Sequence, residues 1–89
     1  MAYDASNLSA LSYANGFTLW HYRTSDAAAD VDTAGYFDSA VRMLRVGDFI
    51  LLNAGVGVAP ANGLMIVATN NGSSVDVTNF FPVGTLNAD

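Results

Sequence analysis

Large side chains alternate along residues 17–23, directly after Gly16. Successive side chains of a strand point to opposite faces, so this pattern predicts a β-strand. One face would carry Phe17, Leu19, His21 and Arg23, and the other Thr18, Trp20 and Tyr22. Because both faces are bulky, we expect the strand to be covered on both sides, on one of them by a neighbouring subunit.

Three further segments are predicted to be strands. Residues 49–54 are almost continuously apolar, which is typical of a strand buried on both faces. Residues 64–69 and 74–78 flank Asn71-Gly72, a dipeptide that favours the positive φ angles of a type I′ turn. We therefore expect these two segments to form an antiparallel hairpin. We expect residues 55–63 to form a flexible loop, or alternatively to hold a short edge strand.

A different period precedes residue 47 and predicts one helix at about residues 33–45. Phe37, Ala40, Val41 and Leu44 follow the i, i+3, i+4, i+7 spacing of a buried helical stripe. Asp32 or Thr33 is a suitable N-cap, and Gly47 a suitable stop.

These elements predict a mainly β fold with one short helix. We expect a small antiparallel β-sandwich or barrel-like domain of four to five strands, with extended terminal arms. The domain would span residues 16–81, between an N-terminal arm over residues 1–15 and a C-terminal tail over residues 82–89. Its length of 89 residues allows one small core.

The predicted N-terminal arm carries scattered apolar side chains in a sequence rich in Ser, Ala and Asn. A purely solvating tail would not need these side chains, so we expect the arm to become ordered when it contacts a partner. The candidate contact residues are Tyr3, Leu8, Leu11 and Tyr13.

Composition strengthens the expectation of protein contacts. The chain is 52% hydrophobic, all eight of its acidic residues are aspartate, and it contains no Glu, Gln or Lys. Short polar side chains lose little rotamer entropy when a neighbour packs against them. We expect a homo-oligomer, preferably a trimer, whose contact residues are Phe17, Leu19, Trp20 and Tyr22.

Charge and residue usage exclude several classes of function. The absence of cysteine excludes disulfides, thiolate metal sites and cysteine nucleophiles. Three arginines and a net charge of −5 do not suit nucleic-acid binding. No run is apolar enough for a membrane span, and no leader is expected at the N-terminus.

No motif supports catalysis, a metal or a cofactor. Asp26, Asp30 and Asp32 resemble the start of a calcium loop, but the closing acidic residue has no counterpart. We expect these aspartates to be solvated or to cap a helix. His21 lacks a nucleophile motif around it, and the glycines of residues 55–63 do not match a phosphate-binding loop. We expect no catalytic residue, no metal and no cofactor.

Four phrases of the sequence carry a resemblance to a known group. These are Leu19-Trp-His-Tyr22, Asp32-Thr-Ala-Gly-Tyr-Phe37, Leu44-Arg-Val-Gly-Asp-Phe-Ile50 and Val75-Asp-Val-Thr78. In order and spacing they resemble small virion structural proteins of tailed bacteriophages, of the kind that decorates or cements the capsid. The resemblance covers residues 17–80 in four separate pieces.

The resemblance implies a non-enzymatic protein on the outer capsid surface of a virion, where it would bridge and stabilise subunits of the major capsid protein. The alternative is a carbohydrate-binding module, or one at a fibre or tail tip, on the same particle. In that alternative Trp20, Tyr22 and Tyr36 would form an exposed aromatic platform.

Overall fold

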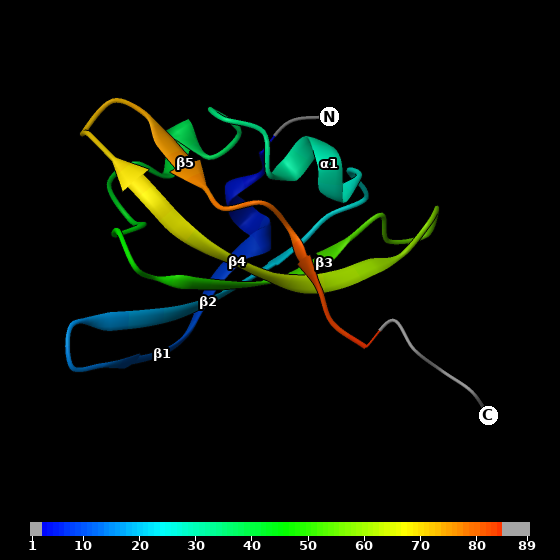
Figure 1. The fold of residues 1–89 in the computed structure, drawn as a ribbon, viewed down its shortest axis with the longest axis horizontal. Coiled ribbons are helices and arrows are strands. Elements are labelled where there is room, and N and C mark those ends of the chain that lie inside the picture. Colours follow the sequence, from blue (N-terminus) through cyan, green and yellow to red (C-terminus); the bar gives the residue numbers. More distant parts are fainter. Residues whose placement is uncertain (1–2, 85–89) are drawn as a thin grey trace.

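The computed structural model describes residues 3–84, which form one open, mixed β-sheet covered on one face (Figure 1). The strands are β1 (Leu8–Ala14), β2 (Phe17–Arg23), β3 (Phe49–Ala54), β4 (Ala61–Asn70), β5 (Val75–Val77) and β6 (Phe81–Pro82). Their order is β1-β2-β3-β4-β5, and β6 pairs with β4. The mainly β prediction with one short helix is confirmed, but the predicted sandwich or barrel is wrong, because this sheet does not close.

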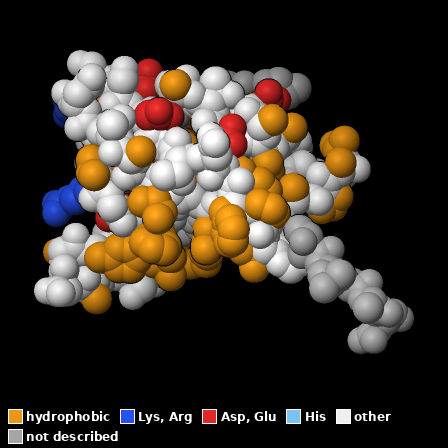
Figure 2. Space-filling view, in the orientation of Figure 1, with side chains coloured by type: hydrophobic (Ala, Val, Ile, Leu, Met, Phe, Trp, Pro, Cys, Tyr) orange, Lys and Arg blue, Asp and Glu red, His pale blue; other side chains and the backbone are white. Residues whose placement is uncertain are grey.

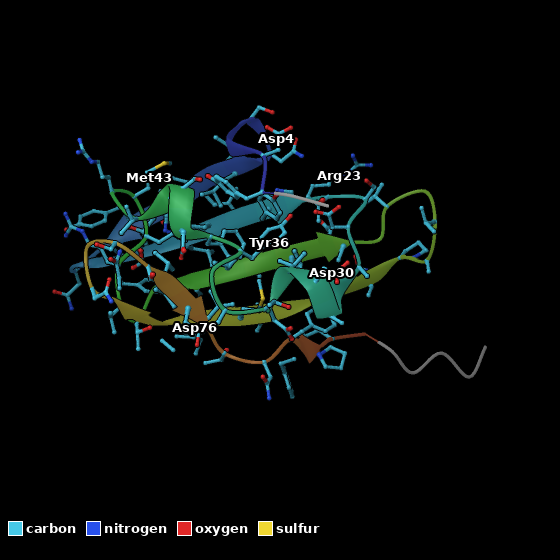
Figure 3. All side chains as sticks on the ribbon, turned by 90° about the horizontal axis from the view of Figure 1, so that it is seen from above. Asp4, Arg23, Asp30, Tyr36, Met43 and Asp76 are labelled. Carbon is cyan, nitrogen blue, oxygen red and sulfur yellow. The ribbon has the colours of Figure 1, made fainter. Side chains whose placement is uncertain are left out.

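The pairing of β2 with β3 determines how the chain covers the sheet. These two strands are parallel, whereas the other pairs are antiparallel, so the expectation of a purely antiparallel sheet is also wrong. A parallel pair needs a long connection. Residues 24–48 provide this crossover, and they carry α1 (Ala28–Val31) and the 3₁₀ turn η2 (Asp38–Ala40) across one face (Figure 3).

The core lies between this crossover and the sheet. From the sheet come Tyr22, Ile50, Leu52, Met65 and Val67, and from the crossover Val31, Phe37, Ala40 and Leu44, all almost fully buried. The strand residues that alternate with the buried ones point to the opposite side, away from the crossover. The sheet is therefore packed by its own chain on one face only.

The predicted helix over residues 33–45 is not formed. Instead α1 ends at Val31, and Asp32 is its C-cap rather than the N-cap of a following helix. Gly35 has a φ of 92°, which an α-helix cannot accommodate, and most backbone bonds that follow join residues three apart. The predicted spacing of buried residues is nevertheless correct, because these turns keep Phe37, Ala40 and Leu44 against the core.

Residues 8–14 do not belong to an extended arm, since they form the edge strand β1. Leu8 is paired with Tyr22 and Ala14 with Phe17, and the dipeptide Asn15-Gly16 makes the turn. Both turn residues have positive φ, 55° and 79°, as a two-residue type I′ hairpin requires. The dipeptide Asn15-Gly16 is therefore a sequence signal for this hairpin, and it argues against an extended arm over residues 8–14.

A short 3₁₀ turn, η1 (Ala5–Asn7), precedes β1 and carries the chain back toward the core. Asp4 caps it, with its carboxylate accepting a hydrogen bond from the Ser6 backbone N–H at 3.0 Å. Before this turn, the Tyr3 ring stacks on Tyr22 with ring centroids 5.6 Å apart. The start of the described chain is therefore fixed by capping and by aromatic packing.

One buried carboxylate connects the end of the crossover to the beginning of β2. Asp48 is 1% exposed and immediately precedes β3. Its carboxylate accepts hydrogen bonds from the Thr18 backbone N–H at 3.1 Å, the Trp20 indole at 2.9 Å and the Arg45 backbone N–H at 3.0 Å. These bonds fix the end of the crossover against the beginning of β2.

The predicted hairpin around Asn71-Gly72 is confirmed, with a different turn. Asn70 pairs with Val75, and the loop is closed by the Asn71 N–H donating to the Ser74 carbonyl at 3.2 Å. Gly72 has a φ of 91°, whereas Asn71 does not have a positive φ. A type I′ turn needs both, so the predicted turn type is wrong.

Replacing Asp48 should strongly destabilise the fold. In Asp48→Asn one carboxylate oxygen becomes an NH₂ group, which would face backbone or indole donors in a buried site. We expect a loss of about 2–3 kcal/mol in the free energy of unfolding, because buried donors lose their acceptor. Denaturant unfolding of this variant and of Asp30→Asn, an exposed matched control, tests this. Equal midpoints for the two variants would contradict the anchoring role of Asp48.

Substitution of Gly72 tests the turn. Gly72→Val should destabilise by more than about 1 kcal/mol, because a β-branched residue resists positive φ. A Cβ at this position would meet no atom within 4 Å, so backbone strain is the only expected cost. Asn tolerates positive φ, and Gly72→Asn should therefore melt close to the wild type. Unchanged melting of Gly72→Val would show that the turn is described incorrectly.

Candidate functional site

The candidate site is the sheet face turned away from the crossover, which we call the open face. Strand pairing arranges its side chains in rows across the sheet. The first row contains Leu19, Phe49 and Ile66, and Phe17 precedes it on β2. The middle row contains His21, Leu51, Leu64 and Phe81. The last row contains Arg23, Asn53 and Asn62. Figure 2 shows hydrophobic side chains gathered on the side away from α1.

One end of the open face is apolar and aromatic. The Phe17 and Phe49 rings contact each other edge to face, with centroids 5.2 Å apart. They remain 36% and 37% exposed, although both lie on central strands of the sheet. Leu19 and Ile66 lie beside them in the same or the adjacent row and are half-buried. A water-facing surface of this kind gains stability when another apolar surface covers it.

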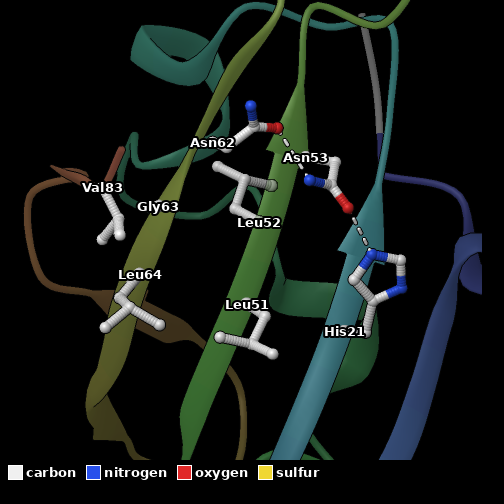
Figure 4. A pocket seen from close by; sticks show the side chains of 8 residues that line it. All are labelled: His21, Leu51, Leu52, Asn53, Asn62, Gly63, Leu64 and Val83. Atoms are coloured by element: carbon white, nitrogen blue, oxygen red, sulfur yellow. Dashed lines mark hydrogen bonds between the residues drawn. The ribbon is translucent and has the colours of Figure 1, made fainter. Parts of the chain in front are cut away.

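Toward the other end of the open face, three polar side chains border a depression whose lining is mainly apolar (Figure 4). His21 Nε2 lies 2.6 Å from Asn53 Oδ1, and Asn53 Nδ2 donates to Asn62 Oδ1 at 2.7 Å. This chain joins β2, β3 and β4 beside a depression of about 410 Å³. The depression is lined by His21, Leu51, Leu52, Asn53, Asn62, Gly63, Leu64 and Val83.

The four residues predicted as the oligomer contact lie in two different places. Phe17 and Leu19 are on the open face, whereas Trp20 and Tyr22 are buried in the core. Trp20 donates its indole N–H to Asp48, and the Tyr22 hydroxyl accepts a hydrogen bond from the Asp4 backbone N–H at 3.0 Å. In the folded chain only the first pair is available for an interface on this strand.

The four residues predicted as the partner contact are likewise divided. Tyr3 is half-buried against Tyr22, and Leu8 is buried in the core, so both are used within the chain. Leu11 and Tyr13 project from β1 and are 54% and 64% exposed. The sequence could not separate these pairs, because the bulge in β1 between Ala10 and Ser12 breaks strand alternation.

The aromatic platform of the carbohydrate-binding alternative is not an exposed surface. Trp20 and Tyr22 are buried, and the half-buried Tyr36 contacts Tyr22 from the crossover side, with the two tyrosine hydroxyls 3.0 Å apart. Tyr36 also donates its hydroxyl proton to Asp26 at 2.7 Å. These rings act as a packed, hydrogen-bonded cluster rather than as a stacking surface.

Asp26, Asp30 and Asp32, whose spacing resembles the start of a calcium loop, lie in three different surroundings. Asp26 is buried against Tyr36, so it is not the solvated residue that the sequence suggested. Asp32 accepts a hydrogen bond from the Phe80 backbone N–H at 2.8 Å, and Asp30 is exposed on α1. Within residues 3–84 no three His, Cys, Asp or Glu side chains converge on a possible metal position.

No helix in the described part of the chain is long and apolar enough to cross a membrane. Comparisons with protein-family models, curated proteins and solved structures found no match. The chemistry of the open face is therefore the main guide to function.

The Tyr36 cluster predicts sensitivity to alkali. Burial is the largest cause of a raised pKa of Tyr36, and its hydrogen bonds to Tyr22 and Asp26 raise that pKa further. The folded chain thus holds this proton above pH ~10, where an unfolded tyrosine loses it. The stabilising contribution is complete below that pH and declines as the pH rises above it.

Denaturant unfolding between neutral pH and pH ~12 should show this decline in the wild type. Tyr36→Phe should be less stable at neutral pH, because Asp26 loses a donor, but its stability should fall less steeply above pH ~10. Tyr13→Phe, on the exposed side of β1, should keep the wild-type slope. Identical slopes for all three proteins would contradict a role for Tyr36 in the alkaline transition.

Proposed function

We propose that this chain is a non-enzymatic structural protein that decorates and stabilises the outer capsid shell of a tailed-phage virion, acting as a homo-oligomer. The single observation that carries the proposal is the open face, an apolar sheet surface that the described chain leaves uncovered. The free energy of an apolar surface is lower when another protein surface covers it than when it faces water.

The positions of the polar groups support a structural role. The buried carboxylate of Asp48 accepts hydrogen bonds that join the crossover to the sheet, and that of Asp26 accepts one from Tyr36 within the crossover. The ring of His21 bonds to the Asn53 amide rather than to a carboxylate or a hydroxyl. These groups therefore perform packing and positioning in the folded chain, not the relay of a proton to a nucleophile.

The resemblance of the four sequence phrases to virion proteins supports the capsid as the assembly. On this view, the open face serves association between copies, and the exposed side chains of β1, Leu11 and Tyr13, contact the major capsid protein. Each contact is small, but an oligomer that touches several capsid subunits gains from multivalency. Short polar side chains around the contacts limit the entropy lost on binding.

Mass spectrometry of purified virions tests the proposal. We expect the chain to be present at a copy number comparable to that of the capsid subunits. Absence from the particle, or the few copies typical of a tail component, would contradict decoration of the shell.

Rebinding to stripped capsids tests the contact surface. The double substitution Leu11→Ser and Tyr13→Ser should lower saturation of the capsid, because it removes the two apolar contacts of β1. Val58→Ser is the control, since Val58 is also apolar and exposed but lies in the loop between β3 and β4. Equal occupancy by the double variant and the control would remove β1 from the contact.

A further inference from the structure

We propose that the open face is covered by the open face of a second copy of this chain, in a twofold symmetric dimer whose two sheets pack face to face with antiparallel strands. This inference rests on the role that the proposed function gives to the open face in association between copies. It names the occupant of that face and the way in which the occupant is oriented.

The shape of the open face is the first argument. At one end the Phe17 and Phe49 rings stand out as an aromatic knob. The depression of about 410 Å³ lies between the middle row, which contains Leu51, and the last row, which contains Asn53. Phe49 and Asn53 are on the same strand, four residues and therefore ~13 Å apart. A knob and a hollow consequently lie side by side along the same strands.

A twofold axis brings these two features together. If the axis runs across the strands near Leu51, it places the knob of each copy over the hollow of the other. Leu51 then lies close to its own counterpart, and Phe49 faces the row of Asn53 and Asn62. One rotation fills both hollows at once, which is the self-complementarity that a closed twofold interface requires.

Charge is the second argument. The rows contributed by β2, β3 and β4 contain one arginine, Arg23, and no carboxylate, although the chain has a net charge of −5. Asp26 and Asp48 lie on the crossover side, and Asp76 is on β5 opposite Thr69, beyond the last apolar row. Two negatively charged copies can therefore approach through this face without placing carboxylates against each other.

The available area is the third argument. Seven-residue strands are ~23 Å long and four neighbouring strands are ~19 Å wide, which gives a projected face of ~440 Å² per copy. Two such faces total ~900 Å² before the relief of the side chains is counted, close to the ~1,000–1,200 Å² of the smallest specific interfaces. A twofold axis uses this one patch on both copies and fills both hollows, so the open face favours a dimer over the predicted trimer.

Sedimentation of the purified protein, with no capsid present, tests the pairing. The wild type should sediment as a dimer at micromolar concentration. Leu51→Asp should sediment as a monomer, because it would bury two carboxylates near the axis. Val46→Asp is the matched control, an exposed apolar residue outside the rows of the open face, and it should stay dimeric.

Phe49→Asp provides a second variant if Leu51→Asp fails to give a folded protein, as judged by circular dichroism. A monomeric wild type, or a dimer that survives the substitution in the open face, would overturn the proposal.

Cross-linking tests the orientation of the two copies, because the chain has no cysteine of its own. A bifunctional maleimide that spans ~10 Å, the spacing of packed sheets, should join Phe49→Cys to Asn53→Cys in a mixture. Neither variant should cross-link efficiently with itself. Efficient self-linking of Phe49→Cys would show that like ends meet, and would overturn the antiparallel arrangement.

The two proposals fail in different experiments. A monomer in sedimentation that nevertheless occupies virions would overturn the dimer, and with it the association between copies, but would support decoration of the capsid. A dimer that is absent from virions would support the pairing and contradict the capsid role.

Discussion

The hydrogen bonds accepted by the Asp48 carboxylate are the constraint on which the rest of the structure depends. They bind the residue that precedes β3 to the Thr18 backbone and the Trp20 indole of β2. With its start fixed there, β3 runs beside β2 in the same direction, and Leu19 is paired with Phe49. The parallel pair, the crossover that it requires and the choice of buried face all follow.

Two other aspartates repeat this role on a smaller scale, which gives a physical reason for the use of aspartate at these positions. Asp38 accepts a hydrogen bond from the Val75 N–H at 2.9 Å, and Asp32 accepts one from the Phe80 N–H at 2.8 Å. Both bonds join the crossover to segments that follow β4. A short carboxylate holds a backbone group close with little loss of rotamer entropy, whereas a longer Glu side chain would lose more.

The sequence could predict those features of the fold that depend on residues close together in the chain. Alternation located β2, the apolar run located β3, and the spacing of Phe37, Ala40 and Leu44 located the buried side of the crossover. The parallel pairing could not be predicted, because it depends on a contact between Thr18 and Asp48, 30 residues apart. Nor could the sequence tell which side of β2 enters the core, since both sides carry bulky residues.

The two bulky sides of β2 also explain why the open face is apolar. The crossover supplies one covering layer, but β3 and β4 are joined by a loop and β4 and β5 by a hairpin, so neither connection carries a second layer. The described chain therefore buries Trp20 and Tyr22 and leaves Phe17 and Leu19 on a face that none of its connections crosses. A strand with bulky residues on both sides, in a fold that covers only one of them, is therefore the physical reason for proposing that another protein surface covers the other side.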